Sequence, residues 1–239
     1  MIAKAIDKIL EVARPAFLEH DGNYYTSKPV HRVDKEQRAD PISCKTLTGL
    51  LDYIADNKDE PAARAYFLHV VSPKRVELIG ALDEDRKREI LMIADAETPT
   101  VPIGSFYDNE SFVIGVQANF VATDARARVL QFAGTVADGT ITDYKDDGVT
   151  QKATIRQGIK GLTPAVVPSP CNLRPYRTFI EVEQPESNFI FRMRSGSHGP
   201  ECALYEADGG AWKHVAMDNI KKYLQEKLKE AGIDMAVIA

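Results

Sequence analysis

The chain has 239 residues, of which 44% are hydrophobic and 27% are charged, and its formal net charge is −5. This length permits a single domain and this composition is ordinary for a globular protein. The excess of acids argues against a general nucleic-acid-binding or membrane-coating role and leaves room only for a local basic patch. No apolar run approaches the length of about 18 residues that a membrane-spanning helix needs.

Cysteine usage indicates the compartment. Cys44, Cys171 and Cys202 are odd in number and widely spaced, which does not suit a disulfide framework. The N-terminal stretch contains acids and lacks the cleavage site of a secretory signal. We therefore expect a cytoplasmic protein with reduced thiols.

The first part of the chain predicts a helix, an edge strand and a second helix. Residues 2–19 have one apolar helical face, and Pro15 is expected to kink or end the regular part. The run Tyr24–Val33 is strand-like, and its Pro29 suits an edge position. Leucines at helical spacing then predict a helix over Cys44–Asn57. The face of the first helix is formed by Ile2, Ile6, Ile9, Leu10, Ala13 and Phe17.

The middle of the chain combines strands and helices. A weak domain boundary lies near residues 98–102, where two prolines occur, although one domain over residues 1–239 is the simpler interpretation. Apolar spacing predicts helices over Asn109–Phe120 and Ala125–Val136. The pair Asp147-Gly148 is typical of a hairpin turn, here between Thr140–Asp143 and Val149–Ile155. Alternating apolar residues before the boundary predict a meander of Arg64–Val71, Arg75–Leu82 and Ile90–Ala96.

The last part predicts three antiparallel strands closed by a helix. We expect a crossing loop over Gly161–Pro175 and a C-terminal helix over Ala211–Ala231. The fold class expected is therefore α+β, with antiparallel sheets and N-terminal, central and C-terminal helices. The three strands are expected over Tyr176–Val182, Asn188–Arg194 and Cys202–Ala207.

The run FIEVEQPESNFIFR at residues 179–192, together with residues 108–120 and the predicted hairpin, resembles the YfdQ-like phage and prophage family, a domain of unknown function. The resemblance covers most of the chain after about Asp40. It implies a bacteriophage or prophage gene acting in the cytoplasm of a bacterial host. It implies no established activity, so no catalytic residue is carried over.

Arginines near the predicted C-terminal strands form the best candidate site for a small ligand. Arg192 and Arg194 share a strand face, and guanidinium groups bind phosphates and carboxylates in a bidentate manner. The alternative is that these two arginines pair with Glu181 and Glu183 across a hairpin. The full candidate set is Arg174, Arg177, Arg192 and Arg194, with Tyr176 and Tyr205 as stacking residues.

Catalytic and metal sites have weaker support, and we assign no catalytic residue, metal or cofactor. The spacing of the zinc-capable residues matches no known finger or ribbon, and Ser195 and Ser197 beside His198 lack a nucleophile elbow. Cys44 or Cys171 with a remote histidine is a further alternative. The zinc-capable residues are Cys171, His198, Cys202 and His214, and the acids considered for phosphoester chemistry are Asp108, Glu110, Asp143, Asp146 and Asp147.

These observations favour a phage-encoded accessory protein that binds without catalytic turnover. In one version it sequesters a small anionic, nucleotide-type ligand to counter host defence. In another it is a protein-interaction module acting on a host factor or on phage DNA-processing machinery. A metal-dependent phosphoester or nucleotide hydrolase is the enzymatic alternative. The edge strand and the apolar tail Ile233–Ala239 also offer surfaces for a homo-oligomer, unless both pack on their own subunit.

Overall fold

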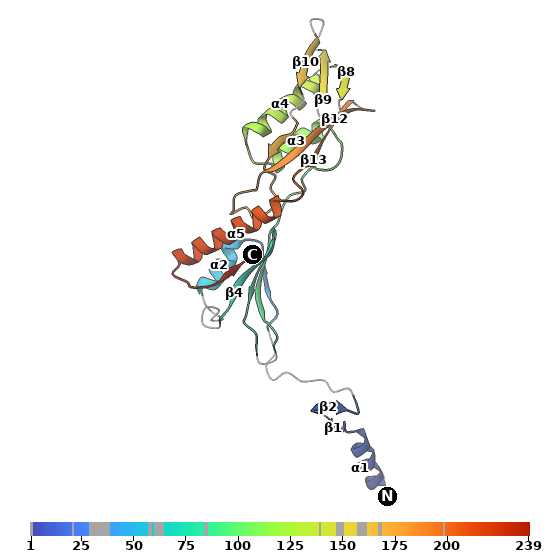
Figure 1. The fold of residues 1–239 in the computed structure, drawn as a ribbon, viewed down its shortest axis with the longest axis vertical. Helices are drawn as coiled ribbons and strands as arrows, with labels where there is room; N and C mark the ends of the chain where they lie inside the picture. Colours follow the sequence, from blue (N-terminus) through green and yellow to red (C-terminus); the bar gives the residue numbers. More distant parts are fainter. Residues whose placement is uncertain are drawn as a thin grey trace. The chain divides into compact units, whose positions relative to one another are not determined.

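The fold combines helices with mainly antiparallel sheets, which confirms the predicted α+β class (Figure 1). The chain divides into two compact units, Met1–Arg38 and Ala39–Ala239, and each is considered by itself. The computed structural model describes residues 2–20, 22–28, 39–56, 59, 65–83, 86–138, 140–146, 151–156, 162–166, 169–197 and 199–239.

The N-terminal unit contains a helix and a hairpin. Helix α1 (Ile2–Ala13) ends two residues before Pro15, close to where this proline was expected to kink or end it. The hairpin pairs β1 (Phe17–His20) with β2 (Asn23–Thr26), where the sequence suggested the end of the helix and an edge strand. The rest of that predicted strand, from Pro29 to Val33, lies outside the described residues.

The second unit begins with a five-stranded mixed sheet. Its central three strands form the predicted antiparallel meander, and the two short outer strands pair with it in parallel. In spatial order the strands are β14 (Val237–Ile238), β4 (Phe67–Ser72), β5 (Arg75–Ile79), β6 (Ile90–Asp95) and β3 (Ile42–Cys44). The predicted apolar tail therefore supplies β14, an edge strand of its own subunit.

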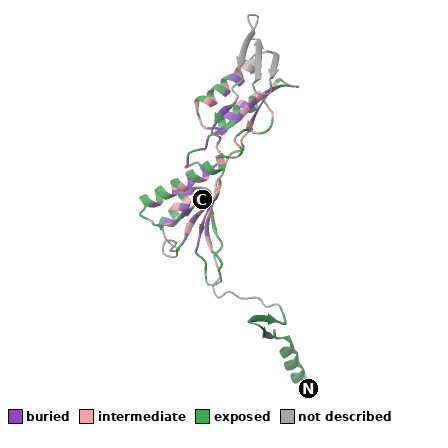
Figure 2. Cartoon of the chain, in the orientation of Figure 1, coloured by how far each residue is buried: buried purple, intermediate pink, exposed green. Residues whose placement is uncertain are grey.

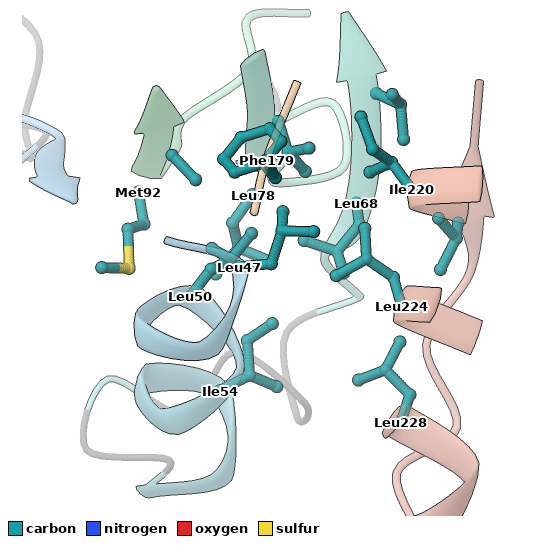
Figure 3. Close-up of a cluster of buried hydrophobic side chains, with 14 of the residues drawn as sticks. Leu47, Leu50, Ile54, Leu68, Leu78, Met92, Phe179, Ile220, Leu224 and Leu228 are labelled. Carbon is teal, nitrogen blue, oxygen red and sulfur yellow. The ribbon is translucent and has the colours of Figure 1, made fainter. Parts of the chain in front are cut away.

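Two helices, α2 (Leu47–Asp56) and α5 (Trp212–Glu230), bury their apolar faces on this sheet (Figure 3). The buried side chains of α5 lie four residues apart and so share one helical face. They point toward the same strands as the buried side chains of α2. Alternate strand residues supply the other half of the core. This first core includes Leu47, Leu50, Ile54, Leu68, Leu78, Met92, Phe179, Ile220, Leu224 and Leu228.

A second core is built from the chain between β6 and α5. The helices α3 (Asn109–Asn119) and α4 (Asp124–Asp138) agree with prediction, and they pack on an antiparallel sheet. Phenylalanine rings from helices and strands meet edge to face, with Phe191 5.6 Å from Phe112 and 5.7 Å from Phe132 between ring centroids. In spatial order the sheet contains β11 (Cys171–Leu173), β12 (Ser187–Gly196), β13 (Gly199–Glu206) and β7 (Tyr107–Asp108).

A separate three-stranded antiparallel sheet follows α4 in the chain. It confirms the predicted hairpin between the first two strands, whose turn at Asp147-Gly148 lies outside the described residues. Its third strand falls in the stretch predicted as a crossing loop. In spatial order the strands are β10 (Leu162–Val166), β9 (Gln151–Arg156) and β8 (Thr140–Asp146).

The prediction of a strand over Tyr176–Val182 is wrong. Residues 176–186 form an irregular segment, and the outer strand that pairs with β12 is β11 instead. The segment turns inward because the buried Gln184 side chain accepts hydrogen bonds from the backbone N–H groups of Arg177 and Thr178 at 3.0 and 3.3 Å. The same side chain donates to the carbonyl oxygen of Phe179 at 2.9 Å. A local side-chain partner thus replaces the sheet partner that the pattern predicted.

Candidate functional site

The four candidate arginines lie on different faces of the second unit. Arg177 is 5% exposed, and its guanidinium pairs with Glu206 on β13 and donates to Ser187 Oγ on β12. Glu206 and Tyr205 are neighbours on β13 and so point to opposite faces of the sheet. Tyr205 pairs with Ile190 on β12, and alternate residues of β12 put Arg192 and Arg194 on the same face as Ile190. Arg177, which contacts Glu206, therefore lies on the opposite face from these two arginines.

Contacts with an aromatic ring and with carboxylates stabilise the buried positive charge of Arg177. Its guanidinium carbon lies 3.9 Å from the centroid of the Trp212 ring, a cation–π contact with the first residue of α5. Burial lowers the pKa of Arg177, and the carboxylates of Glu206 and Asp208 act against that shift. Burial acts to raise the pKa of Asp208, but hydrogen bonds from Ser187 and the Gly210 N–H lower it overall. The network ties β12 and β13 to the start of α5.

The FIEVEQPESNFIFR run has structural roles in this fold. The Glu181 carboxylate accepts hydrogen bonds from the backbone N–H groups of Leu47 and Thr48, at 2.8 and 3.3 Å, and thereby caps the N-terminus of α2. The carbonyl oxygen of Glu183 accepts from Asn219 Nδ2 on α5 at 3.0 Å. The stretch therefore fastens the two helices of the first core to the segment that leads into β12.

Arg174 and Tyr176 belong to the beginning of the same segment. The Arg174 guanidinium pairs with Glu183 at 2.6 Å and with Glu186 at 3.4 Å. The backbone N–H of half-buried Tyr176 donates to the Asn119 carbonyl at the end of α3, at 2.9 Å. Both residues hold the segment in place.

Arg192, Arg194 and Tyr205 share the outer face of the β12–β13 pair, and for the two arginines parity predicted this. Arg194 pairs with its cross-strand neighbour Glu201 at 2.7 Å, and its guanidinium carbon lies 4.1 Å from the Phe106 ring centroid. The same phenylalanine contacts Tyr205 edge to face at 6.2 Å. The alternative pairing of Arg194 with Glu181 or Glu183 is thus wrong, because the hairpin partner of β12 is β13.

The zinc-capable residues are not assembled in the part of the chain that the structure describes. Cys171 pairs with Phe189 and Cys202 with Met193, so the two cysteines are offset by four residue steps along β12, about 13 Å. Burial raises the pKa of each of these two thiols to about 12, which keeps both protonated at neutral pH. His198 lies outside the described residues, and His214 is exposed on α5.

The acids considered for phosphoester chemistry have backbone roles where their side chains are described. Asp108 caps α3 by accepting a hydrogen bond from the Ser111 N–H at 2.9 Å, and this bond lowers the pKa of Asp108. Glu110 lies in the first turn of the same helix, where a negative charge is favourable. The side chains of Asp143 and Asp146 and the whole of Asp147 lie outside the described residues.

The N-terminal unit presents an apolar surface that the sequence patterns only half indicated. Its helical face was predicted, but a helix with no buried residue was not. The described side chains of residues 2–28 are exposed throughout, and Figure 2 shows the helix and hairpin in the colour of exposed residues. We call this region the N-terminal apolar surface, formed by Ile2, Ile6, Ile9, Leu10, Val12, Leu18, Tyr24 and Tyr25.

Hydrogen bonds to backbone groups fix the helix to the hairpin within this unit. Lys28 Nζ donates to the carbonyl oxygens of Val12 and Ala13, at 3.0 and 2.7 Å, and so caps the C-terminus of α1 with a positive charge. Ala16 and Ser27 exchange hydrogen bonds at 2.9 and 3.0 Å, which closes the base of the hairpin against the helix end. The unit thus has defined internal contacts without buried side chains among its described residues.

Comparisons with protein-family models, curated proteins and solved structures give no match. The resemblance to the YfdQ-like family therefore stays a prediction. Among the described helices, none is long and apolar enough to span a membrane.

Proposed function

We propose that this chain is a phage- or prophage-encoded accessory protein that acts by binding another protein chain, without catalytic turnover. The observation that supports this most strongly is the N-terminal apolar surface, where the large aliphatic side chains of α1 are 51–79% exposed. Contiguous exposed apolar side chains on a folded segment are typical of protein–protein contact sites. The phage setting comes from the family resemblance.

A protein partner suits these contacts better than a small anionic ligand does. A nucleotide-binding arginine cluster needs guanidinium groups that converge on one pocket with unused donors. Here Arg174, Arg177 and Arg194 point to different carboxylates of the same chain, and Arg177 lies on the opposite sheet face from Arg194. The protein-interaction role is accordingly the version that we carry forward.

The test compares full-length protein with a variant whose N-terminal apolar surface is made polar. We expect wild type to form a specific, saturable protein complex, and Ile6→Glu/Ile9→Glu to abolish it. Lys4→Glu, on the charged side of the same helix, is the matched control and should leave the complex intact. Complex formation that survives the double substitution would overturn the proposal. Circular dichroism melting of each variant checks that residues 39–239 stay folded.

A thermal-shift screen with nucleotides and cyclic dinucleotides tests the competing version. A ligand at a hundred times its dissociation constant adds about 2.7 kcal/mol to stability, which is readily seen as a rise in melting temperature. A rise that disappears in Arg194→Ala would favour ligand sequestration over a protein partner. An unchanged melting temperature across the screen agrees with the proposal.

A further inference from the structure

The apolar residues of α1 follow the spacing of a coiled-coil seam. The intervals between successive positions are four, three and four residues, which is the alternation of heptad positions d, a, d and a. The residues at these positions are Ile2, Ile6, Ile9 and Ala13. Such spacing keeps one stripe of side chains directed at a parallel partner helix along the whole length of α1.

The positions beside the seam are apolar as well, and the charges are confined to the far side. Under the same heptad assignment the flanking e and g positions carry Ala3, Leu10, Ala5 and Val12. The outer b, c and f positions carry Asp7, Lys8, Lys4 and Glu11. A two-stranded coiled coil usually has charged e and g residues, whereas a wider apolar face suits a bundle in which each helix contacts two neighbours.

The N-terminal unit has little of its own to stabilise it. An isolated helix of about 12–15 residues is marginal in water, and α1 has 12. Folded segments below about 40 residues usually depend on disulfides, metals or oligomerisation. The sequence of residues 1–38 contains no cysteine, and no metal-binding cluster is found among the described residues. Oligomerisation is the one of these three means that the apolar face of α1 itself suits.

We propose that the protein partner of the N-terminal apolar surface is a second copy of the same surface, with α1 helices of three or more chains associating in parallel. This inference rests on the proposed function and names its partner. Isoleucine at both a and d favours three or four strands over two. In a parallel bundle the same position of each chain lies at the same height, so Ile2, Ile6 and Ile9 each pack against the equivalent isoleucine of the other chains, and Ala13 forms a smaller last layer. In such a bundle one side of each helix contacts the other side of the next, and the ring closes with cyclic symmetry.

The charge on α1 favours this partner over a lipid surface. Helices that lie on anionic membranes are rich in lysine and arginine on the polar face. The polar face of α1 carries two lysines and two acids, and Lys8 pairs with Glu11 at 2.8 Å. Balanced charge on the outside of a bundle is compatible with the repeated approach of identical helices.

The first experiment measures the mass of the full-length protein in solution by sedimentation equilibrium. We expect at least three times the chain mass of 26.5 kDa for wild type and for Lys4→Glu. Ile6→Glu/Ile9→Glu should sediment as a single chain. A monomeric wild type overturns the inference, as does an oligomer that the double substitution leaves intact. A wild type that is monomeric and co-sediments with vesicles of anionic phospholipid would assign the surface to lipid instead.

A disulfide test shows which positions meet and does not depend on disrupting the helix. In a Cys44→Ser background, Ile9→Cys and Lys4→Cys are each oxidised with copper phenanthroline, which accepts the electrons released as two thiols form one disulfide. We expect covalent dimers for Ile9→Cys within a parallel seam and none for Lys4→Cys on the outer side. Equal cross-linking of both variants, or none at either position, overturns the parallel bundle.

The outcomes also separate this inference from the proposed function. If wild type is a monomer yet binds a different protein, and Ile6→Glu/Ile9→Glu abolishes that binding, the bundle fails and the protein-binding role stands. If no complex of any kind depends on these two positions, both fail.

Discussion

Two helices of this chain have nearly the same apolar spacing and opposite surroundings. On α5, Ile220, Leu224 and Leu228 are almost fully buried against a sheet. On α1, Ile2, Ile6 and Ile9 are more than half exposed. An amphipathic pattern therefore indicates that a helix has an apolar partner, but it does not tell whether that partner belongs to the same chain. The predictions below test this difference between the buried cores and the N-terminal apolar surface.

The largest effect is expected from Phe191→Ala in the second core. Phe191 is fully buried and contacts two other phenylalanine rings, so its removal leaves a cavity in addition to the reduced burial. We expect the free energy of unfolding to fall by about 3–5 kcal/mol, measured by urea denaturation. Phe191→Leu is the control and should lose less, since it refills part of the space. A loss below about 1 kcal/mol for Phe191→Ala would show that this core contributes little to cooperative unfolding.

The next effect distinguishes the buried arginine from the exposed one. Arg177→Ala removes the hydrogen bonds to Ser187 and Glu206 and the cation–π interaction with Trp212, and we expect a loss of about 2–3 kcal/mol. Arg194→Ala removes an ion pair whose arginine side chain is more than half exposed, and it should cost at most about 1 kcal/mol. An equal loss of unfolding free energy in the two variants would contradict the assignment of Arg177 to a buried face and Arg194 to an exposed one.

Sequence patterns predicted those parts of the body (the unit Ala39–Ala239) in which local periodicity and tertiary packing agree. The helices after residues 46, 108 and 123 and the meander of β4–β6 follow directly from apolar spacing. The predicted strand over residues 176–182 was wrong because an alternating run also fits a loop whose backbone N–H groups donate to a side chain, here Gln184. That partner is buried by tertiary packing, which a pattern does not contain.

The candidate site was predictable to the same extent. Strand parity correctly placed Arg192 and Arg194 on one face, since parity depends only on strand geometry. The position of Arg177 depends on the path of an irregular segment, so no periodicity could place it. The apolar face of α1 was visible as spacing, whereas spacing alone does not tell that this face has no buried residue.

A smaller effect is expected where the FIEVEQPESNFIFR run caps a helix. Glu181→Ala leaves two backbone N–H groups of α2 without their carboxylate, and we expect a loss of about 1 kcal/mol in urea denaturation. Glu183→Ala is the matched control: its exposed pair with Arg174 should contribute less than about 0.5 kcal/mol. The reverse order would assign the stabilising role to the ion pair.

Acid should weaken the body through the cap of α3. The Ser111 N–H holds the pKa of Asp108 below its ordinary value of about 3.9, so the folded state favours the carboxylate. A lowered pKa gives stability that is present above the unfolded pKa and is lost as pH falls through the folded pKa. The difference in melting temperature between wild type and Asp108→Ala should therefore narrow below about pH 3.9. A constant difference from neutral to acidic pH would contradict a charged cap.

The smallest effect on the body is expected from Ile6→Ala, and it bears most directly on the difference between the two helices. Ile6 is exposed and belongs to the other unit, so the free energy of unfolding of residues 39–239 should change by less than about 0.5 kcal/mol. The oligomer mass should fall instead, because the seam loses one isoleucine layer in every chain. If urea denaturation shows a loss as large as that of Phe191→Ala at unchanged mass, then α1 packs on its own chain, and the resemblance between α1 and α5 extends to their surroundings as well as their spacing.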